Sequence, residues 1–141
     1  MTTTEIQNEI IEEFSLFDNK NDQYNYIIDL GKSLETMEES KKVDENIIKG
    51  CQSKVWLATD LADDKFIQFK ADSDAIMVKG LVFMLVRILS NRTPQEILDT
   101  ELFFMEKVGL NQMLSMTRSN GLASMIKQMK LYALAYQAKL G

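Results

Sequence analysis

One stretch of this 141-residue chain alternates between two faces, and it limits the folds available to the protein. From Ser53 to Ala71 the side chains have a period of two, and β-branched or aromatic residues are frequent. Residues 62–65 interrupt the pattern with turn-forming side chains. The stretch therefore predicts a β-hairpin with strands at 55–60 and 66–71. Because no other stretch has a clear strand pattern, helices must complete the core.

The sequence before the hairpin predicts two helices. The first is expected to start at Thr4, with Gln7 at capping-box spacing and apolar residues at every fourth position. Residues 18–22 are typical of a turn, and a second helix is expected over about 24–34. Gly31 lowers the stability of that helix by roughly 1 kcal/mol relative to alanine, so we expect another element to pack closely there. A polar loop then leads to the hairpin.

The sequence after the hairpin predicts further helices. Asp72-Ser73-Asp74 is expected to supply capping oxygens for a buried helix that ends near Ser90. Thr93-Pro94-Gln95-Glu96 is a capping box with proline at the first helical position. A short helix over 102–108 should end at the glycine that follows it.

A final helix is expected over about 119–139. Its inner face should consist of Leu122, Met125, Ile126, Met129, Tyr132, Ala133 and Tyr136. These patterns predict one α+β domain over residues 1–141, in which a small antiparallel β-sheet is covered by helices.

The longest apolar stretch, Ala75 to Leu89, is expected to be a core helix. It contains Lys79 and Arg87, and it is shorter than the roughly 20 residues that a bilayer crossing needs. The N-terminus lacks a basic segment followed by an apolar one, so no secretion signal is predicted. Together with the low use of cysteine, these features predict a cytoplasmic protein without a membrane partner.

The net charge of −5 argues against nucleic acid as a partner. The charge is unevenly distributed: residues 1–48 contain 12 acidic and 4 basic side chains, whereas residues 118–141 contain 4 basic side chains and no acidic one. Two interpretations remain open. The charges are either solvated helix faces of opposite sign or a polarised docking surface for another protein.

Cys51 is the only cysteine, and the chain contains no histidine. One thiol cannot form an internal disulfide or a multi-thiolate metal site, and without histidine there is no cysteine–histidine catalytic pair. The neighbouring Gly50 permits a sharp turn, while Gln52 and Ser53 are polar. Cys51 is therefore predicted to be either a small buried hydrophobic residue or a reactive thiol on a loop that precedes a strand.

Several segments together carry a resemblance to a known family. Residues 50–56 (GCQSKVW), 72–81 (DSDAIMVKGL), 93–97 (TPQEI) and 114–122 (LSMTRSNGL) resemble successive motifs of the SufE family, the sulfur-acceptor proteins of iron–sulfur cluster assembly. Residues 24–31 resemble the helical segment that precedes the cysteine motif in that family. One departure is Met116-Thr117 before Arg118, where the family usually has proline and serine; Thr117 is expected still to cap the final helix.

The resemblance implies a fold similar to SufE and IscU, a reaction and its partners. In SufE proteins the signature cysteine, here Cys51, takes the terminal sulfur of a persulfide on a SufS-like cysteine desulfurase and passes it to a SufBCD-like scaffold. Pyridoxal phosphate belongs to the desulfurase, so no cofactor is expected on this chain, which is expected to be a monomer or a weak homodimer. We also expect the free protein to shield Cys51 partly and docking to expose it.

Two further residues are candidates for supporting roles. Arg118 either makes a surface ion pair, or lowers the pKa of Cys51 or contacts the desulfurase. Asp74 is expected in the first turn of a helix, with a supporting contact to the cysteine loop as an alternative. A rival function is a non-catalytic regulator that stimulates a desulfurase without relaying sulfur. A thiol-dependent enzyme acting on small molecules is disfavoured by the absence of histidine and of a glycine-rich phosphate loop.

Overall fold

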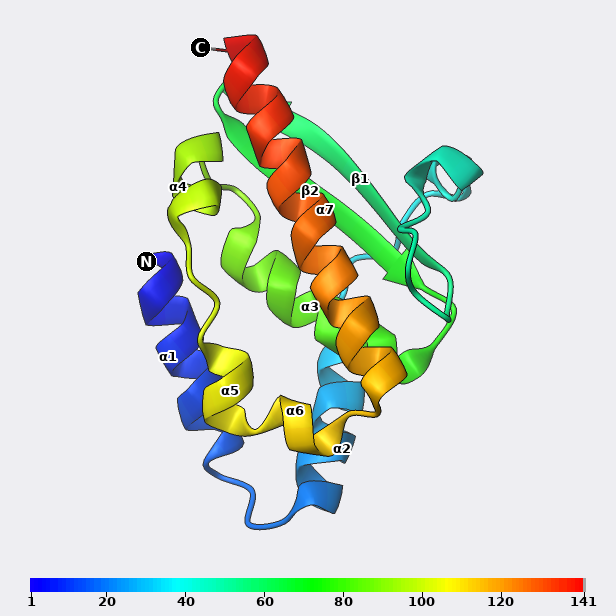
Figure 1. The fold of residues 1–141 in the computed structure, drawn as a ribbon, viewed down its shortest axis with the longest axis vertical. Coiled ribbons are helices and arrows are strands. Elements are labelled where there is room, and N and C mark those ends of the chain that lie inside the picture. The colour runs from blue at the N-terminus through cyan, green and yellow to red at the C-terminus, as the bar shows by residue number, and fades with distance from the viewer. Residues whose placement is uncertain (141) are drawn as a thin grey trace.

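A computed structural model describes residues 1–140 and contains one antiparallel hairpin that lies at one side of a group of helices (Figure 1). The strands are β1 (Val55–Ala62) and β2 (Phe66–Ser73), paired from Val55 opposite Ser73 to Ala62 opposite Phe66. The helices are α1 (Thr3–Phe14), α2 (Lys20–Gly31), α3 (Ile76–Leu89), α4 (Pro94–Asp99), α5 (Phe104–Val108), α6 (Leu110–Met113) and α7 (Met116–Leu140). Two short 3₁₀ turns, η1 (Glu39–Lys41) and η2 (Asp44–Asn46), lie in the loop before β1. The predicted α+β class is confirmed.

Helix α3 lies at the centre of the core. Its residues Leu81, Met84, Ile88 and Leu89 have no solvent exposure, and the helix contacts β2, α1, α2 and α7. This position explains why its sequence is apolar on nearly every side. The long helix α7 crosses in front of the hairpin and packs against α3 and α4 (Figure 1).

The expectation of close packing at Gly31 is confirmed, because α2 and α3 meet through two glycines. A Cβ atom added to Gly80 would lie 1.9 Å from the backbone oxygen of Ile27, and one added to Gly31 would lie 2.8 Å from the backbone nitrogen of Gly80. Any side chain at these positions would have to separate the two helix backbones.

The predicted start of α1 was wrong by two residues. Thr2, rather than Thr4, is the N-cap, and its capping-box partner is Glu5. Gln7 is completely buried instead: its amide donates to Glu101 O at 3.0 Å, and its Oε1 accepts from the Phe103 and Phe104 N–H groups at 2.9 and 3.2 Å. Thr2 and Thr4 each have a suitable capping-box partner three residues later. The long-range hydrogen bonds of Gln7 decide which threonine caps the helix.

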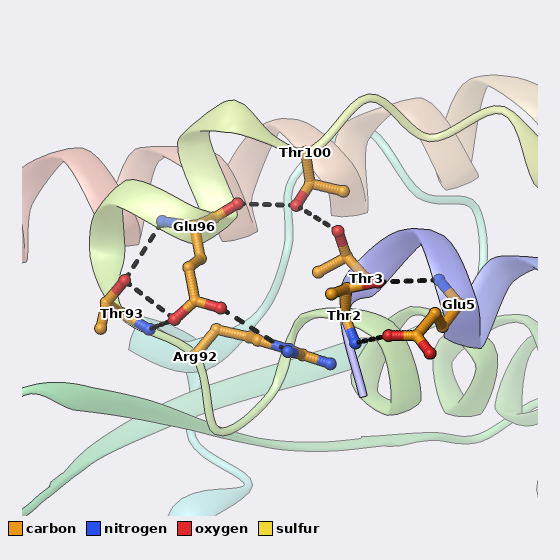
Figure 2. A network of polar contacts seen from close by, with 7 residues as sticks. All are labelled: Thr2, Thr3, Glu5, Arg92, Thr93, Glu96 and Thr100. Carbon is orange, nitrogen blue, oxygen red and sulfur yellow. Dashed lines mark hydrogen bonds and ion pairs between the residues drawn. The ribbon is translucent and has the colours of Figure 1, made fainter.

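A second capping box faces the first across a short polar network (Figure 2). Thr93 and Glu96 form the box at the start of α4, as the sequence predicted. The hydroxyl of Thr100 donates to Glu96 O at 2.6 Å and lies within hydrogen-bond distance, 3.1 Å, of Thr3 Oγ1. The N-terminal helix is thereby tied to α4.

The predicted caps of α3 and α7 also need correction. Asp72 and Ser73 still belong to β2, Asp74 precedes the helix, and the N-cap position of α3 is Ala75 without a side-chain cap. Helix α7 begins at Met116, earlier than expected, and Ser115 Oγ accepts from Arg118 N–H at 3.3 Å. Thr117 lies inside the helix and does not cap it.

Candidate functional site

Gly50 shapes the loop that presents Cys51. Its φ of +94° lies in a region that side-chain-bearing residues rarely adopt. A Cβ atom at Gly50 would also lie 2.6 Å from Ser124 Oγ on α7. The loop therefore turns directly against α7 at the residue before the thiol, and glycine satisfies both the backbone conformation and the close contact.

The thiol of Cys51 points toward α7 and is partly buried. Its Sγ–H donates to the backbone oxygen of Gly121 at 3.5 Å. Burial raises the pKa of Cys51, since removing the thiolate from water disfavours the charged form. At neutral pH the free protein therefore holds a protonated thiol, which is the less nucleophilic form.

A small cavity of about 100 Å³ lies beside the sulfur. It combines an apolar floor with a polar rim, and α7 provides one wall. The lining residues are Cys51, Gln52, Ser53, Val55, Val78, Leu81, Thr117, Arg118, Gly121 and Met125. Residues far apart in the sequence thus meet at one thiol.

Arg118 lies at the rim of this cavity, with its backbone in the first turn of α7. Its Nη1 donates to the Tyr24 hydroxyl at 3.1 Å, and the residue is exposed. Among residues 1–140 it forms no ion pair, so the surface salt bridge, one of the alternatives for this residue, is not found there. The pKa of Cys51 is raised, with burial as the cause, rather than lowered as the thiol-tuning alternative for Arg118 would have it.

Asp74 contacts the other end of the cysteine loop. Its Oδ1 accepts from Lys54 N–H at 3.1 Å, and the Asp74 N–H in turn donates to Lys54 O at 3.2 Å. Gln52 is exposed and Ser53 is half-buried. The structure thus places Gly50, Gln52, Ser53 and Arg118 around Cys51, and Asp74 at the point where the loop enters β1.

Sequence reasoning took Asp72 for a helix cap and missed its pairing with Lys42, which anchors the loop ahead of Cys51. Lys42 Nζ lies 3.0 Å from Asp72 Oδ2 and 5.6 Å from the centroid of the Trp56 ring. Burial of Asp72 raises its pKa, but hydrogen bonds from Lys42 and from Ser73 N–H outweigh this effect and leave the pKa lowered. Asp72 and Lys42 are 30 positions apart, so no local pattern could have paired them.

Gly121 and Ser124 were missed for the same reason. Both lie on α7 in a segment with the pattern of an ordinary helix, and their importance comes from contact with residues 50 and 51. Gly121 lies within the 114–122 motif, but neither the motif nor the spacing of Gly121 and Ser124 indicates which residues they contact. Within residues 1–140 no group of three acidic, histidine or cysteine side chains is arranged to hold a metal ion.

Comparison with known proteins decides the family. A family model described as the SufE Fe-S metabolism associated domain matches residues 8–133. The chain belongs to the SufE family. An uncharacterized SufE-like protein of Rhizobium meliloti is 41% identical over 126 residues, covering 86% of this chain and 90% of that protein. A second, from Synechocystis, is 38% identical over 128 residues, covering 91% of this chain and 80% of that protein.

A solved structure shares the fold of this SufE-family chain. The solution structure of a hypothetical protein from Thermus thermophilus superposes with a TM-score of 0.76 at 13% identity, covering 94% of this chain and 96% of that one. At that identity the likeness concerns the fold alone. The family places the chain in iron–sulfur metabolism. No helix within residues 1–140 has both the length and the apolar composition needed to cross a membrane.

Proposed function

We propose that this SufE-family protein accepts sulfur on Cys51 from a persulfide carried by a cysteine desulfurase. The observation that carries the proposal is the position of the single cysteine. It follows a glycine of positive φ on a loop, and it adjoins a cavity with room beside the sulfur. That placement, in a chain of a family associated with iron–sulfur metabolism, suits a thiol that takes up and shelters one additional sulfur atom.

The transfer step is a thiol–disulfide type exchange. The Cys51 thiolate attacks the outer sulfur of the partner's persulfide, and a new S–S bond forms on Cys51. The S–S bond to the partner's cysteine breaks at the same time, and that cysteine leaves as a thiolate. No external oxidant or reductant is needed, because one sulfur–sulfur bond replaces another.

The free protein holds Cys51 in a form that is poorly suited to attack. Its thiol is partly buried, donates to Gly121 O and has a raised pKa. Docking to the desulfurase therefore has to turn the thiol away from α7 and into the partner's active site, where deprotonation becomes favourable. The cavity beside Cys51 would then receive the new persulfide when the loop returns, and its apolar floor would exclude water.

The sulfur then has to leave for an acceptor that builds clusters. A second nearby cysteine could attack the persulfide on Cys51 and release sulfide, whereas this chain has one cysteine in total. We propose a SufBCD-like scaffold as the acceptor and a cytoplasmic location for the exchange. Arg118 is proposed to contact the desulfurase, since its side chain lies at the rim of the cavity and is exposed.

Intact-mass measurement tests the proposal directly. The purified protein is mixed with a SufS-like desulfurase and L-cysteine, and an adduct of about 32 Da is expected on the wild type. Reductant should remove the adduct, and the Cys51→Ala variant should not form it. An unmodified wild-type protein beside an active desulfurase would refute the sulfur-acceptor role.

The rate of the desulfurase reaction distinguishes the regulator hypothesis from the sulfur-acceptor proposal. The regulator hypothesis is favoured by one observation: the thiol of the free protein faces α7 and donates to Gly121 O. A pure regulator would stimulate the desulfurase fully as Cys51→Ser. A sulfur acceptor would lose stimulation with that variant while still binding the desulfurase.

A further inference from the structure

A second and larger groove lies on the far side of the cysteine loop from the thiol cavity. It has a volume of about 450 Å³ and runs between the segment before Gly50 and the middle of α7. Its lining residues are Glu45, Asn46, Ile47, Ile48, Lys49, Leu57, Ser124, Lys127, Gln128, Leu131 and Tyr132. Neither the sulfur-transfer step nor the family motifs make use of this groove.

The groove reaches β1 at Leu57, and the open edge of this strand continues beyond it. The segment before Gly50 pairs with this edge only at its start, where Ile48 N–H donates to Val55 O at 2.8 Å and Ile47 bridges Trp56. Because backbone polar groups of a strand alternate between its edges, Thr59 and Leu61 direct theirs to the same side as Val55. Within residues 1–140, neither makes a backbone hydrogen bond outside the hairpin.

The charge of the groove differs from that of the whole chain. Lys49 and Lys127 are exposed on opposite walls, and neither forms an ion pair within residues 1–140. Glu45 is the one acidic lining residue, so the lining side chains carry a net charge of +1. Lys130, one turn from Lys127, is already engaged, because its ammonium donates to Ile97 O at 2.9 Å and to Leu98 O at 3.3 Å. Within the described residues, the groove thus offers two unpaired cations on a protein with a net charge of −5.

Apolar surface completes the groove. Leu131 lines the groove from α7 and is 46% exposed, while Leu57 is a buried lining residue. An unpaired strand edge, an exposed leucine and two free lysines together match an extended, acidic polypeptide. The edge supplies backbone hydrogen bonds, and the side chains supply selectivity.

We infer that this groove binds an extended acidic segment of a partner protein, which adds to the edge of β1. Carboxylates of the segment pair with Lys49 and Lys127, and an apolar side chain covers Leu131. Lys49 is bonded to Gly50, so the bound segment lies next to the loop that carries Cys51. The site goes beyond the proposed sulfur transfer, and it can be tested without a desulfurase.

The test is a two-dimensional amide NMR titration of the whole protein. The probe is an N-acetylated, C-amidated peptide of seven residues in which glutamate alternates with valine. We expect saturable shifts confined to the groove residues and to the open edge of β1, with slower hydrogen exchange of the Thr59 and Leu61 amides in the bound state. The K49E/K127E double variant should bind at least tenfold more weakly.

A charge-matched control separates the groove from general attraction to an acidic peptide. The K107E/K139E double variant changes the net charge equally at exposed positions outside the groove, and it should bind as the wild type does. Equal weakening in both double variants would overturn the inference. So would shifts spread over all surface lysines, or no shift at millimolar peptide.

Other occupants would also be revealed. N-acetylglutamate binding as tightly as the peptide would assign the groove to small carboxylates and overturn the strand addition, as would peptide binding that leaves Thr59 and Leu61 unprotected. Shifts at the β1 edge that depend on protein concentration alone would assign it to a second copy of this chain. If the peptide does not bind but the sulfur adduct forms, the groove inference is overturned and the proposed function stands.

Discussion

The α2–α3 contact and the cysteine loop both depend on glycine, but the atoms facing the glycines differ. In the core, a Cβ atom on Gly80 would meet the backbone of Ile27 at 1.9 Å. At the loop, a Cβ atom on Gly50 would meet the terminal hydroxyl of Ser124, and one on Gly121 would reach Cys51 Sγ at 3.5 Å, an ordinary contact. Backbone cannot move without separating helices, whereas side-chain ends can rotate. The core contact is therefore fixed and the loop contact is releasable.

The largest expected effect is that of Gly80→Ala. The new methyl group has no space beside the Ile27 carbonyl, so α2 must move away from α3, at a cost of about 3 kcal/mol or more. Urea denaturation followed by circular dichroism measures the loss. Stability within about 1 kcal/mol of the wild type would mean that the helix contact yields as easily as the loop does.

Gly50→Ala is expected to have an intermediate effect on stability. The positive φ strains an alanine backbone by about 1–3 kcal/mol, while the Ser124 hydroxyl can rotate away. We also expect faster alkylation of Cys51 by iodoacetamide in the folded protein, since the strained loop leaves α7 more often. Ser124→Ala in the same background controls for the hydroxyl contact, and unchanged alkylation would contradict a releasable loop.

Gly121→Ala should be tolerated. The added methyl group reaches Cys51 Sγ at an ordinary contact distance, and alanine favours the helix by about 1 kcal/mol relative to glycine. Unfolding free energy should therefore stay the same or rise slightly, and Cys51 should alkylate more slowly because the thiol is more enclosed. A clear loss of stability would mean that the contact at Gly121 is rigid, like the one at Gly80, and not releasable, like the one at Gly50.

The pH dependence of Cys51 alkylation should report the same shielding with the smallest effect. Burial raises the pKa of the folded thiol above its unfolded value, so the folded protein favours the protonated form. The protonated Cys51 thiol therefore contributes fully to the free energy of unfolding at pH values below its unfolded pKa. This contribution is lost as the pH rises through the folded pKa. The midpoint of the rate profile should lie higher for the native than for the urea-unfolded protein; coincident midpoints would contradict shielding.

Local signals predicted much of the fold. The turn end of the hairpin, where Ala62 pairs with Phe66, the capping box at Thr93 and the helix end at Gly109 each depend on residues within a few positions of one another. Where two local solutions competed, prediction failed. Gln7 and Asp74 both suit helix caps, and both are used instead for hydrogen bonds to distant backbone.

The sequence by itself determined that the protein contains one thiol, a single sheet and an apolar central helix. Composition and short-range periodicity are local properties, and folding does not change them. The tertiary structure alone decided that Cys51 faces Gly121, that Ser124 packs on Gly50 and that Lys49 and Lys127 share a groove. Those pairs join α7 to a loop some 70 positions earlier, and only the packing of the helices around the hairpin brings them into contact.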